Sequence, residues 1–178
     1  LSETRASLSR NMQVLEIGCG TGMTALIHAP RVRHIHAIDY SERMIQIAAE
    51  KLEKSAIKNV SFEHADFDGF TRPVASFDAI LGLNFLHLSQ DTTRTLNRIH
   101  KLLKPGGVFV SSTECVGDMN PIMRAIAYLG GRLGVLPRVK NLTAKGLKSD
   151  LSIARFECVK SHSFGGGRSV FIVAKKSN

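Results

Sequence analysis

Three glycines occupy alternate positions directly after a short apolar run, in the stretch Val14-Leu15-Glu16-Ile17-Gly18-Cys19-Gly20-Thr21-Gly22. A chain that turns sharply from a strand into a helix needs backbone conformations, and a close approach to a ligand, that a Cβ would obstruct. Asp39 ends the next apolar run, 17 residues after Gly22. A carboxylate at a strand end can accept two hydrogen bonds from the vicinal hydroxyls of a ribose. This spacing predicts a pocket for a cofactor that carries adenosine.

Two other kinds of nucleotide site fit the residues less well. A dinucleotide site usually has the spacing Gly-x-Gly-x-x-Gly, whereas this chain has Gly-x-Gly-x-Gly. Glu16 lies two residues before the first glycine, where a carboxylate is a poor neighbour for a phosphate and a good one for a cation. The phosphate-binding sequence Gly-x-x-x-x-Gly-Lys-Ser/Thr does not occur. The glycine loop therefore favours a cationic adenosyl ligand.

The run Leu15 to Gly22 resembles the first motif of the class I S-adenosylmethionine-dependent methyltransferases. Four later stretches resemble the second to fifth motifs of this family, in order and at the family's spacing, at 37–44, 64–67, 77–84 and 103–109. The resemblance covers roughly residues 12–114 and is nearest to the small-molecule branch typified by the ubiquinone and menaquinone biosynthesis methyltransferases. It implies S-adenosylmethionine as cofactor and S-adenosylhomocysteine as product.

The resemblance also implies roles at the methionine and ribose end of the cofactor. The family uses the backbone of the first loop for the methionine part, which assigns that role to Gly18, Cys19, Gly20 and Gly22. The family's acid for the ribose corresponds to Asp39. Glu16 either bonds the cofactor's ammonium, directly or through water, or orients the loop.

Four residues are implied at the adenine. Tyr40 and Met44 would flank the ring, although their spacing also suits a helix start and a core position. An acid at the place of Asp66 accepts from the exocyclic amine in the family, and the backbone amide of Phe67 would donate to the ring. The alternative for Asp66 is a surface turn beside Asp68.

Asn84 ends the fourth apolar run, and ligands of open parallel sheets bind beyond the carboxyl ends of the strands. The cofactor's methyl group is therefore expected near Asn84 and Phe85. His87 follows closely, and its near-neutral pKa suits removal of a proton from a phenol, an enol or an acidic carbon, while a buried core histidine is the alternative. The other six histidines and the three cysteines lack metal-ligand spacing, so no metal is expected.

The elements that must position these residues alternate along the chain. Short apolar runs at 14–17, 31–38, 60–64, 77–83 and 108–112 are separated by helical patterns, which is typical of a parallel sheet. Ser41 is expected to cap one helix and Asp91 or Ser89 another, which the stretch 104–107 would end. The runs 156–160 and 169–174 are close enough to pair antiparallel. Together with the resemblance, these elements predict an α/β, Rossmann-like, doubly wound fold with a mostly parallel seven-stranded sheet and a C-terminal antiparallel hairpin.

A chain of 178 residues fits a single domain, 1–178. Residues 119–148 interrupt the alternation, contain Gly130, Gly131 and Gly134, and are expected to form an inserted, lid-like segment over the methyl acceptor. The chain begins with leucine only about a dozen residues before the first strand, so a trimmed N-terminus is a fair expectation. Three widely spaced cysteines and the lack of a signal-like apolar stretch suggest the cytoplasm.

The formal net charge is +9, from 24 basic and 15 acidic side chains. The whole excess lies in residues 121–178, where 11 basic side chains face the two acids Asp150 and Glu157. Such a distribution can attract an anionic small molecule, a membrane surface or RNA, or can simply keep the protein soluble. The oligomeric state is left open.

The fourth motif reads Leu83-Asn84-Phe85-Leu86. It does not resemble the Asn/Asp-Pro-Pro-Tyr/Phe signature of the methyltransferases that act on amino groups of nucleic acid bases and glutamine. The leading hypothesis is therefore methyl transfer to oxygen or carbon of a small molecule. Two alternatives stay open: an RNA methyltransferase that uses the basic last third, and a scaffold that binds S-adenosylmethionine without catalysis.

Overall fold

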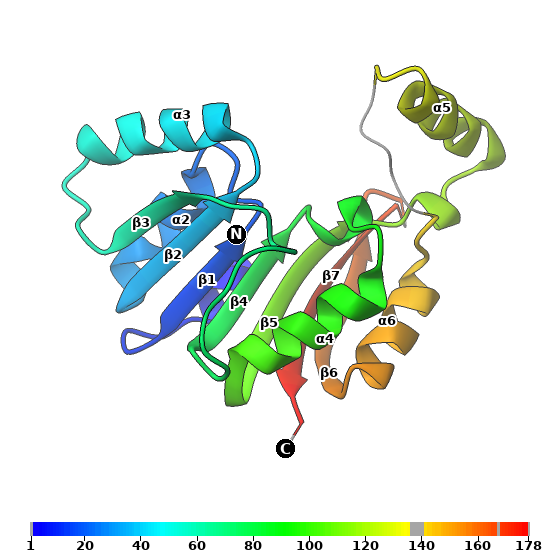
Figure 1. The fold of residues 1–178 in the computed structure, drawn as a ribbon. Helices are drawn as coiled ribbons and strands as arrows, with labels where there is room; N and C mark the ends of the chain where they lie inside the picture. Colours follow the sequence, from blue (N-terminus) through cyan, green and yellow to red (C-terminus); the bar gives the residue numbers. More distant parts are fainter. Residues whose placement is uncertain (1, 136–140, 167, 178) are drawn as a thin grey trace.

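The computed structural model describes residues 2–135, 141–166 and 168–177. Its centre is one seven-stranded sheet with the order β3-β2-β1-β4-β5-β7-β6 (Figure 1). The strands are β1 Gln13–Ile17, β2 His34–Asp39, β3 Val60–His64, β4 Phe77–Leu83, β5 Leu103–Glu114, β6 Phe156–Phe164 and β7 Ser169–Lys176. The α/β fold with a mostly parallel seven-stranded sheet is confirmed.

The first five strands run parallel, and the last two form an antiparallel hairpin on their edge. β1 pairs in parallel with both β2 and β4, so the strand order reverses on either side of β1. β7 pairs antiparallel with β5 and with β6. Loops after β1 and β4 therefore diverge at the switch point where α/β sheets bind ligands.

Two apolar clusters cover the two faces of the sheet. One contains Ala25 of α2 (Met23–His28), with Ile45 and Leu52 of α3 (Glu42–Glu53) packed against it. The other contains Leu96 of α4 (Thr92–Leu102) and Leu151 of α6 (Ala144–Ile153). Figure 1 shows α4 and α6 in front of the sheet and α2 behind it. Burial on both faces explains why the central strands read as continuous apolar runs.

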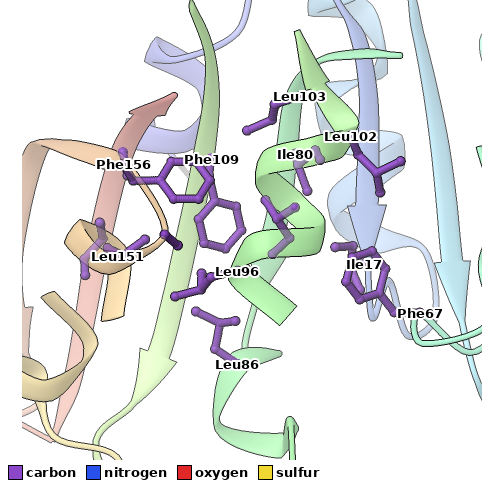
Figure 2. Close-up of a cluster of buried hydrophobic side chains, with 14 of the residues drawn as sticks. Ile17, Phe67, Ile80, Leu86, Leu96, Leu102, Leu103, Phe109, Leu151 and Phe156 are labelled. Carbon is purple, nitrogen blue, oxygen red and sulfur yellow. The ribbon is translucent and has the colours of Figure 1, made fainter. Parts of the chain in front are cut away.

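Figure 2 shows the second of these clusters, in which the apolar side chains of α4 pack on β4 and β5. Leu96 and Ile99 of α4 are fully buried, as are Ile80 of β4 and Phe109 of β5. Leu86 lies in the 3₁₀ helix η2 (Leu86–Leu88), which follows β4, and its side chain is fully buried in the same cluster. The core therefore reaches the loop that follows β4 and holds it in place.

The expected helix caps are present. The hydroxyl of Ser41 accepts from the backbone N–H of Met44 at 3.4 Å at the start of α3. At the start of α4, Asp91 accepts from the N–H of Arg94 at 2.9 Å, so Asp91 is the cap and not Ser89. Each cap satisfies a backbone donor that the first helical turn leaves without an intrahelical acceptor.

Several strand boundaries differ from those expected, among them the end of β6, which lies at Phe164 and not at residue 160. β2 begins at His34, because residues 29–31 form the 3₁₀ helix η1 (Ala29–Arg31). β5 begins at Leu103, directly after α4, so the stretch 104–107 ends the helix but is part of the strand. The register between β4 and β5 shifts between Phe77 and Ala79, and this irregularity accommodates the extra residues.

The segment 119–148 contains two different kinds of structure. α5 (Pro121–Arg132) follows η3 (Val116–Asp118) and runs without a break through Gly130 and Gly131, which the sequence pattern had treated as interruptions. α6 begins at Ala144 and belongs to the packed body, since Leu147 is fully buried. Residues 136–140 lie outside the described residues. In the described parts of the chain, no helix is long and apolar enough to cross a membrane.

Candidate functional site

The loop between β1 and α2 is held against β2 by its own backbone. The N–H groups of Gly18 and Cys19 both donate to the carbonyl oxygen of Ile38, at 2.9 and 3.0 Å. The three glycines all have positive φ: +69° at Gly18, +52° at Gly20 and +73° at Gly22. These angles favour glycine because a Cβ strains the left-handed conformation.

The glycines differ in what surrounds them. A Cβ at Gly22 would lie 2.5 Å from the ring of Phe62 and 2.8 Å from the Cβ of Ala48, so this glycine lets α2 approach β3 and α3. A Cβ at Gly20 would meet no atom within 4 Å. Gly20 thus presents bare backbone to open space, which a ligand can approach.

Asp39, at the end of β2, links the glycine loop to the next turn. Its side chain is only 8% exposed. Oδ2 accepts from the N–H of Gly20 at 2.8 Å, and Oδ1 accepts from the N–H of Ser41 at 2.9 Å. A carboxylate offers about four lone-pair positions, so these two bonds leave acceptor capacity for two hydroxyls.

Glu16, in β1, is the unusual group of this region. It is 2% exposed, and its Oε2 has no hydrogen-bond partner among the residues that the structure describes. Burial raises the pKa of its carboxyl to about 8. Burial also raises the pKa of the Cys19 thiol, and the charges of Glu16 and Asp39 raise it further, which places all three groups in one small region. A buried acid without a partner is ionised at neutral pH only when a cation or a set of donors joins it.

The loops after β1, β3 and β4 converge through aromatic rings. Phe67 is buried, and its ring meets that of Phe85 edge to face at 5.7 Å. The ring of Phe85 also lies 3.6 Å from the position that a Cβ at Gly18 would take. Asp66 is exposed and its Oδ1 accepts from the N–H of Asp68 at 3.2 Å, so it forms a turn and keeps free acceptor positions. These rings build an apolar wall between the glycine loop and the predicted adenine residues.

Tyr40 and Met44 lie at the start of α3, and both side chains are exposed. Their side chains are 76% and 38% exposed. The carbonyl of Tyr40 is hydrogen-bonded to Nε2 of His64 at 2.9 Å, which fixes its backbone beside the end of β3. Both side chains are free to pack on a ring that enters from solvent, and their adenine role stays a prediction.

Asn84 directly follows β4 and has a φ of +58°, which is uncommon for a residue other than glycine. Its N–H donates to the carbonyl oxygen of Ser112 at 2.7 Å, while its side chain is exposed. Backbone strain of this kind gathers at functional sites. The strained turn places the Asn84 side chain at the carboxyl edge of the sheet.

His87 lies in η2, is 9% exposed, and has no hydrogen-bond partner for Nδ1 in the described part of the chain. Burial lowers its pKa, and the nearby carboxylate of Glu114 opposes this shift. A neutral imidazole at neutral pH has a nitrogen free to accept a proton. His87 lies three residues after Asn84, in the turn that follows β4, and its burial favours the neutral imidazole; its role as a base stays a prediction.

The sequence pattern did not single out Glu114. Glu114 ends β5, half-buried, and its Oε1 accepts from the hydroxyl of Ser169 at 3.1 Å. The signal was available, because the rule that ligands meet strand ends applies to β5 as it does to β2 and β4. The expected strand stopped at residue 112, two residues before this acid.

Two of the histidines, His34 and His36, belong to a hydrogen-bond network within the sheet. His34 and His36 share the hydroxyl of Ser61, at 3.0 Å each, and His36 also pairs with Glu63 at 2.8 Å. This network ties β2 to β3. Among the described residues, no group of three or more His, Cys, Asp or Glu side chains is arranged to hold a metal ion, and all three cysteines are free.

Residues 8–155 match the family model of a methyltransferase domain. The chain is 28% identical over 102 residues to the uncharacterized methyltransferase YdaC of Bacillus subtilis, covering 56% of this chain and 55% of that protein. It is 32% identical over 130 residues to a demethylmenaquinone methyltransferase of Leptospira interrogans, covering 70% of this chain and 51% of that protein. The chain thus spans about half the length of these curated relatives.

The crystal structure of the YcgJ protein of Bacillus subtilis has the same fold, with a TM-score of 0.83 at 16% identity, covering 99% of this chain and 97% of that one. The motif order, the glycine loop at the switch point and the matched family model agree with one another. The chain therefore belongs to the class I S-adenosylmethionine-dependent methyltransferases.

Proposed function

We propose that this chain binds S-adenosylmethionine at the ends of β1 and β2 and transfers its methyl group to an oxygen or carbon of a small molecule. The observation that carries the proposal is the carboxylate of Glu16, which is 2% exposed and has an Oε2 without a partner among the described residues. The ammonium of the cofactor is a cation, and it would donate the hydrogen bond that Oε2 of Glu16 does not receive from the described residues. Asp39, which retains acceptor positions, suits the ribose hydroxyls.

The residues present fit the cofactor in three respects. Gly20 leaves open space where a side chain would stand, so loop backbone can approach the methionine part. The buried ring of Phe67 and the half-buried ring of Phe85 exclude water between the loops. The exposed carboxylate of Asp66 keeps acceptor positions for an exocyclic amine. When bound, the cofactor supplies an electrophilic methyl group on a sulfonium, which is a good leaving group.

The chain's own task is to align the acceptor with that methyl group in a dry environment, and positioning can supply most of the acceleration. Asn84 and His87 lie at the edge of the sheet where the acceptor would approach. The sequence Asn84-Phe85-Leu86 and the likeness to a demethylmenaquinone methyltransferase support an oxygen or carbon acceptor.

Cofactor binding is expected to depend on the bare backbone of Gly20. Calorimetry with S-adenosylmethionine and S-adenosylhomocysteine should show micromolar dissociation constants for the native chain. Gly20→Val should abolish the binding, because its side chain fills the space open to the ligand and strains a φ of +52°. Gly166→Val is the matched control, since Gly166 has a φ of +69° and equally open surroundings far along the chain.

Equal loss of binding in the two valine variants would show that backbone strain alone is responsible. Undiminished binding in Gly20→Val would contradict the assignment of the site. Binding of the native chain without turnover on any phenol, enol or RNA would favour the scaffold alternative over catalysis.

His87→Gln is expected to lower kcat by about 100-fold on acceptors whose nucleophile carries a proton, the lower end of typical general-base effects. The cofactor dissociation constant should not change. Since burial lowers the pKa of His87, the native rate should hold at neutral pH and fall only as the pH drops below the ordinary histidine value of 6.5. His100→Gln is the control, because His100 is also a histidine with a lowered pKa and with no hydrogen-bond partner for Nε2 among the described residues, but it lies in α4. An unchanged rate and pH profile in His87→Gln would exclude the base.

A further inference from the structure

α5 presents an apolar stripe to solvent. At about 100° per residue, the positions 122, 126, 129 and 133 fall within a sector about 60° wide. They hold Ile122, Ile126, Leu129 and Leu133, whose side chains are 73%, 52%, 60% and 76% exposed. Val135, just after the helix, is 77% exposed. Contiguous exposed aliphatic side chains on a surface helix indicate an interaction site.

The stripe points away from the body of the protein. Gly131, which is nine positions after Ile122 and therefore about half a turn around the helix, is buried. Gly131 is the one buried residue of α5, all of which the structure describes, so the helix packs little against the protein and leaves its aliphatic side free. This arrangement is the reverse of an ordinary surface helix, whose apolar stripe faces the core.

Basic residues, and no acidic ones, fill the sequence between Asp118 and Asp150, and two of them, Arg124 and Arg132, lie on α5. From Met119 to Ser149 there is no acidic residue, and six basic residues occur: Arg124, Arg132, Arg138, Lys140, Lys145 and Lys148. A helix with aliphatic residues on one side and basic residues around it binds in the interface of an anionic bilayer, where apolar burial and attraction to lipid head groups add. A second copy docked on this helix would bring together two α5 helices that each carry Arg124 and Arg132 and no acidic residue, and these charges repel.

We propose that α5 is a membrane-docking helix, which inserts its Ile122, Ile126, Leu129 and Leu133 side chains into an anionic lipid surface. Figure 1 shows α5 standing away from the sheet, beyond the ends toward which β4 and β5 point. Asn84 follows β4 at that same edge. Docking through α5 would therefore turn the edge that holds the candidate site toward the bilayer, where an apolar acceptor dissolves.

Flotation with lipid vesicles tests this proposal. The native chain should bind vesicles of phosphatidylcholine mixed with phosphatidylglycerol, and should bind pure phosphatidylcholine at least tenfold more weakly. The double variant Ile126→Ser/Leu129→Ser should lose at least tenfold in binding to the anionic vesicles, because each isoleucine or leucine loses several buried CH₂ groups. Both side chains are more than half exposed, so its melting temperature should equal that of the native chain.

The matched control is Ile153→Ser/Val159→Ser, which removes two aliphatic side chains that are 65% and 61% exposed but lie outside α5. This control should bind vesicles like the native chain. Equal binding to neutral and anionic vesicles, no binding at all, or native binding by the α5 variant would each overturn the proposal. So would a dimer in sedimentation that the α5 variant abolishes without any vesicle binding. Membrane binding does not require methyl transfer, so the vesicle assay and the cofactor titration succeed or fail separately.

Discussion

Glu16→Gln is expected to stabilise the protein without ligand and, at the same time, to weaken cofactor binding. The native carboxyl is buried, and burial raises its pKa to about 8. At neutral pH the unfolded chain releases this proton and the folded chain keeps it, and this difference opposes folding. The difference from the ordinary value of 4.5 corresponds to about 3 kcal/mol at pH 7. A neutral amide of the same shape removes this penalty, and the free energy of unfolding in urea should rise by up to about 3 kcal/mol.

The pH dependence of the free energy of unfolding follows from the raised pKa of Glu16. Between pH 4.5 and about 8 the folded chain keeps a proton on Glu16 that the unfolded chain releases, so native stability decreases as the pH rises through this window. The lowered pKa values of His28 and His87 act the other way, because the unfolded chain takes up those protons below pH 6.5. They act equally in both proteins, so the difference between the native chain and Glu16→Gln isolates Glu16.

Binding of S-adenosylmethionine should be about tenfold weaker in Glu16→Gln, since a charge-assisted hydrogen bond to the ammonium contributes about 1.5–3 kcal/mol, part of which goes into ionising the buried acid. The native chain should release a proton on binding at pH 7, detectable by calorimetry in buffers with different ionisation enthalpies. Glu157→Gln, on an exposed residue of β6, is the control. Equal affinity and no proton release in both proteins would show that Glu16 does not contact the cofactor.

Asp39→Ala is expected to weaken cofactor binding by at least about 100-fold, because two hydrogen bonds to a charged acceptor are lost together. The substitution also removes the acceptor for the N–H groups of Gly20 and Ser41, so the glycine loop loses its link to the end of β2. The free energy of unfolding should therefore fall by about 1–2 kcal/mol. Calorimetry and urea unfolding measure the two effects independently.

The matched control for Asp39→Ala is Asp91→Ala. Asp91 also accepts a backbone N–H, that of Arg94 at 2.9 Å, as the cap of α4. Its loss should lower stability by about 1 kcal/mol and leave cofactor affinity unchanged. If Asp39→Ala bound the cofactor as well as Asp91→Ala does, the ribose would lie elsewhere.

Much of the fold could be predicted because its signals are local. β3 and β4 have the expected bounds, and Ser41 caps the expected helix. Strand alternation, caps and glycine turns depend on a few neighbouring residues, so one sequence reveals them.

Other features depend on pairing between distant segments. β5 begins at Leu103 and reaches Glu114 because it pairs with β4 on one side and β7 on the other, and that length places an unexpected acid beside His87. The glycines at 130 and 131 do not interrupt α5, since a loss of about 1 kcal/mol per glycine is small enough for the rest of the helix to offset.

The amino-acid sequence by itself determined the family, the order of the family's motifs along the chain and the residues of the glycine loop. Each motif is a short stretch, and its backbone conformation and hydrogen-bonding groups depend on its own residues. The tertiary structure alone decided that Asp39 binds the loop it faces, that Glu16 is buried with no partner for its Oε2 among the described residues, and that α5 turns its aliphatic side outward. Burial and orientation are properties of what packs around a residue, and that packing is set by contacts between segments far apart in the chain.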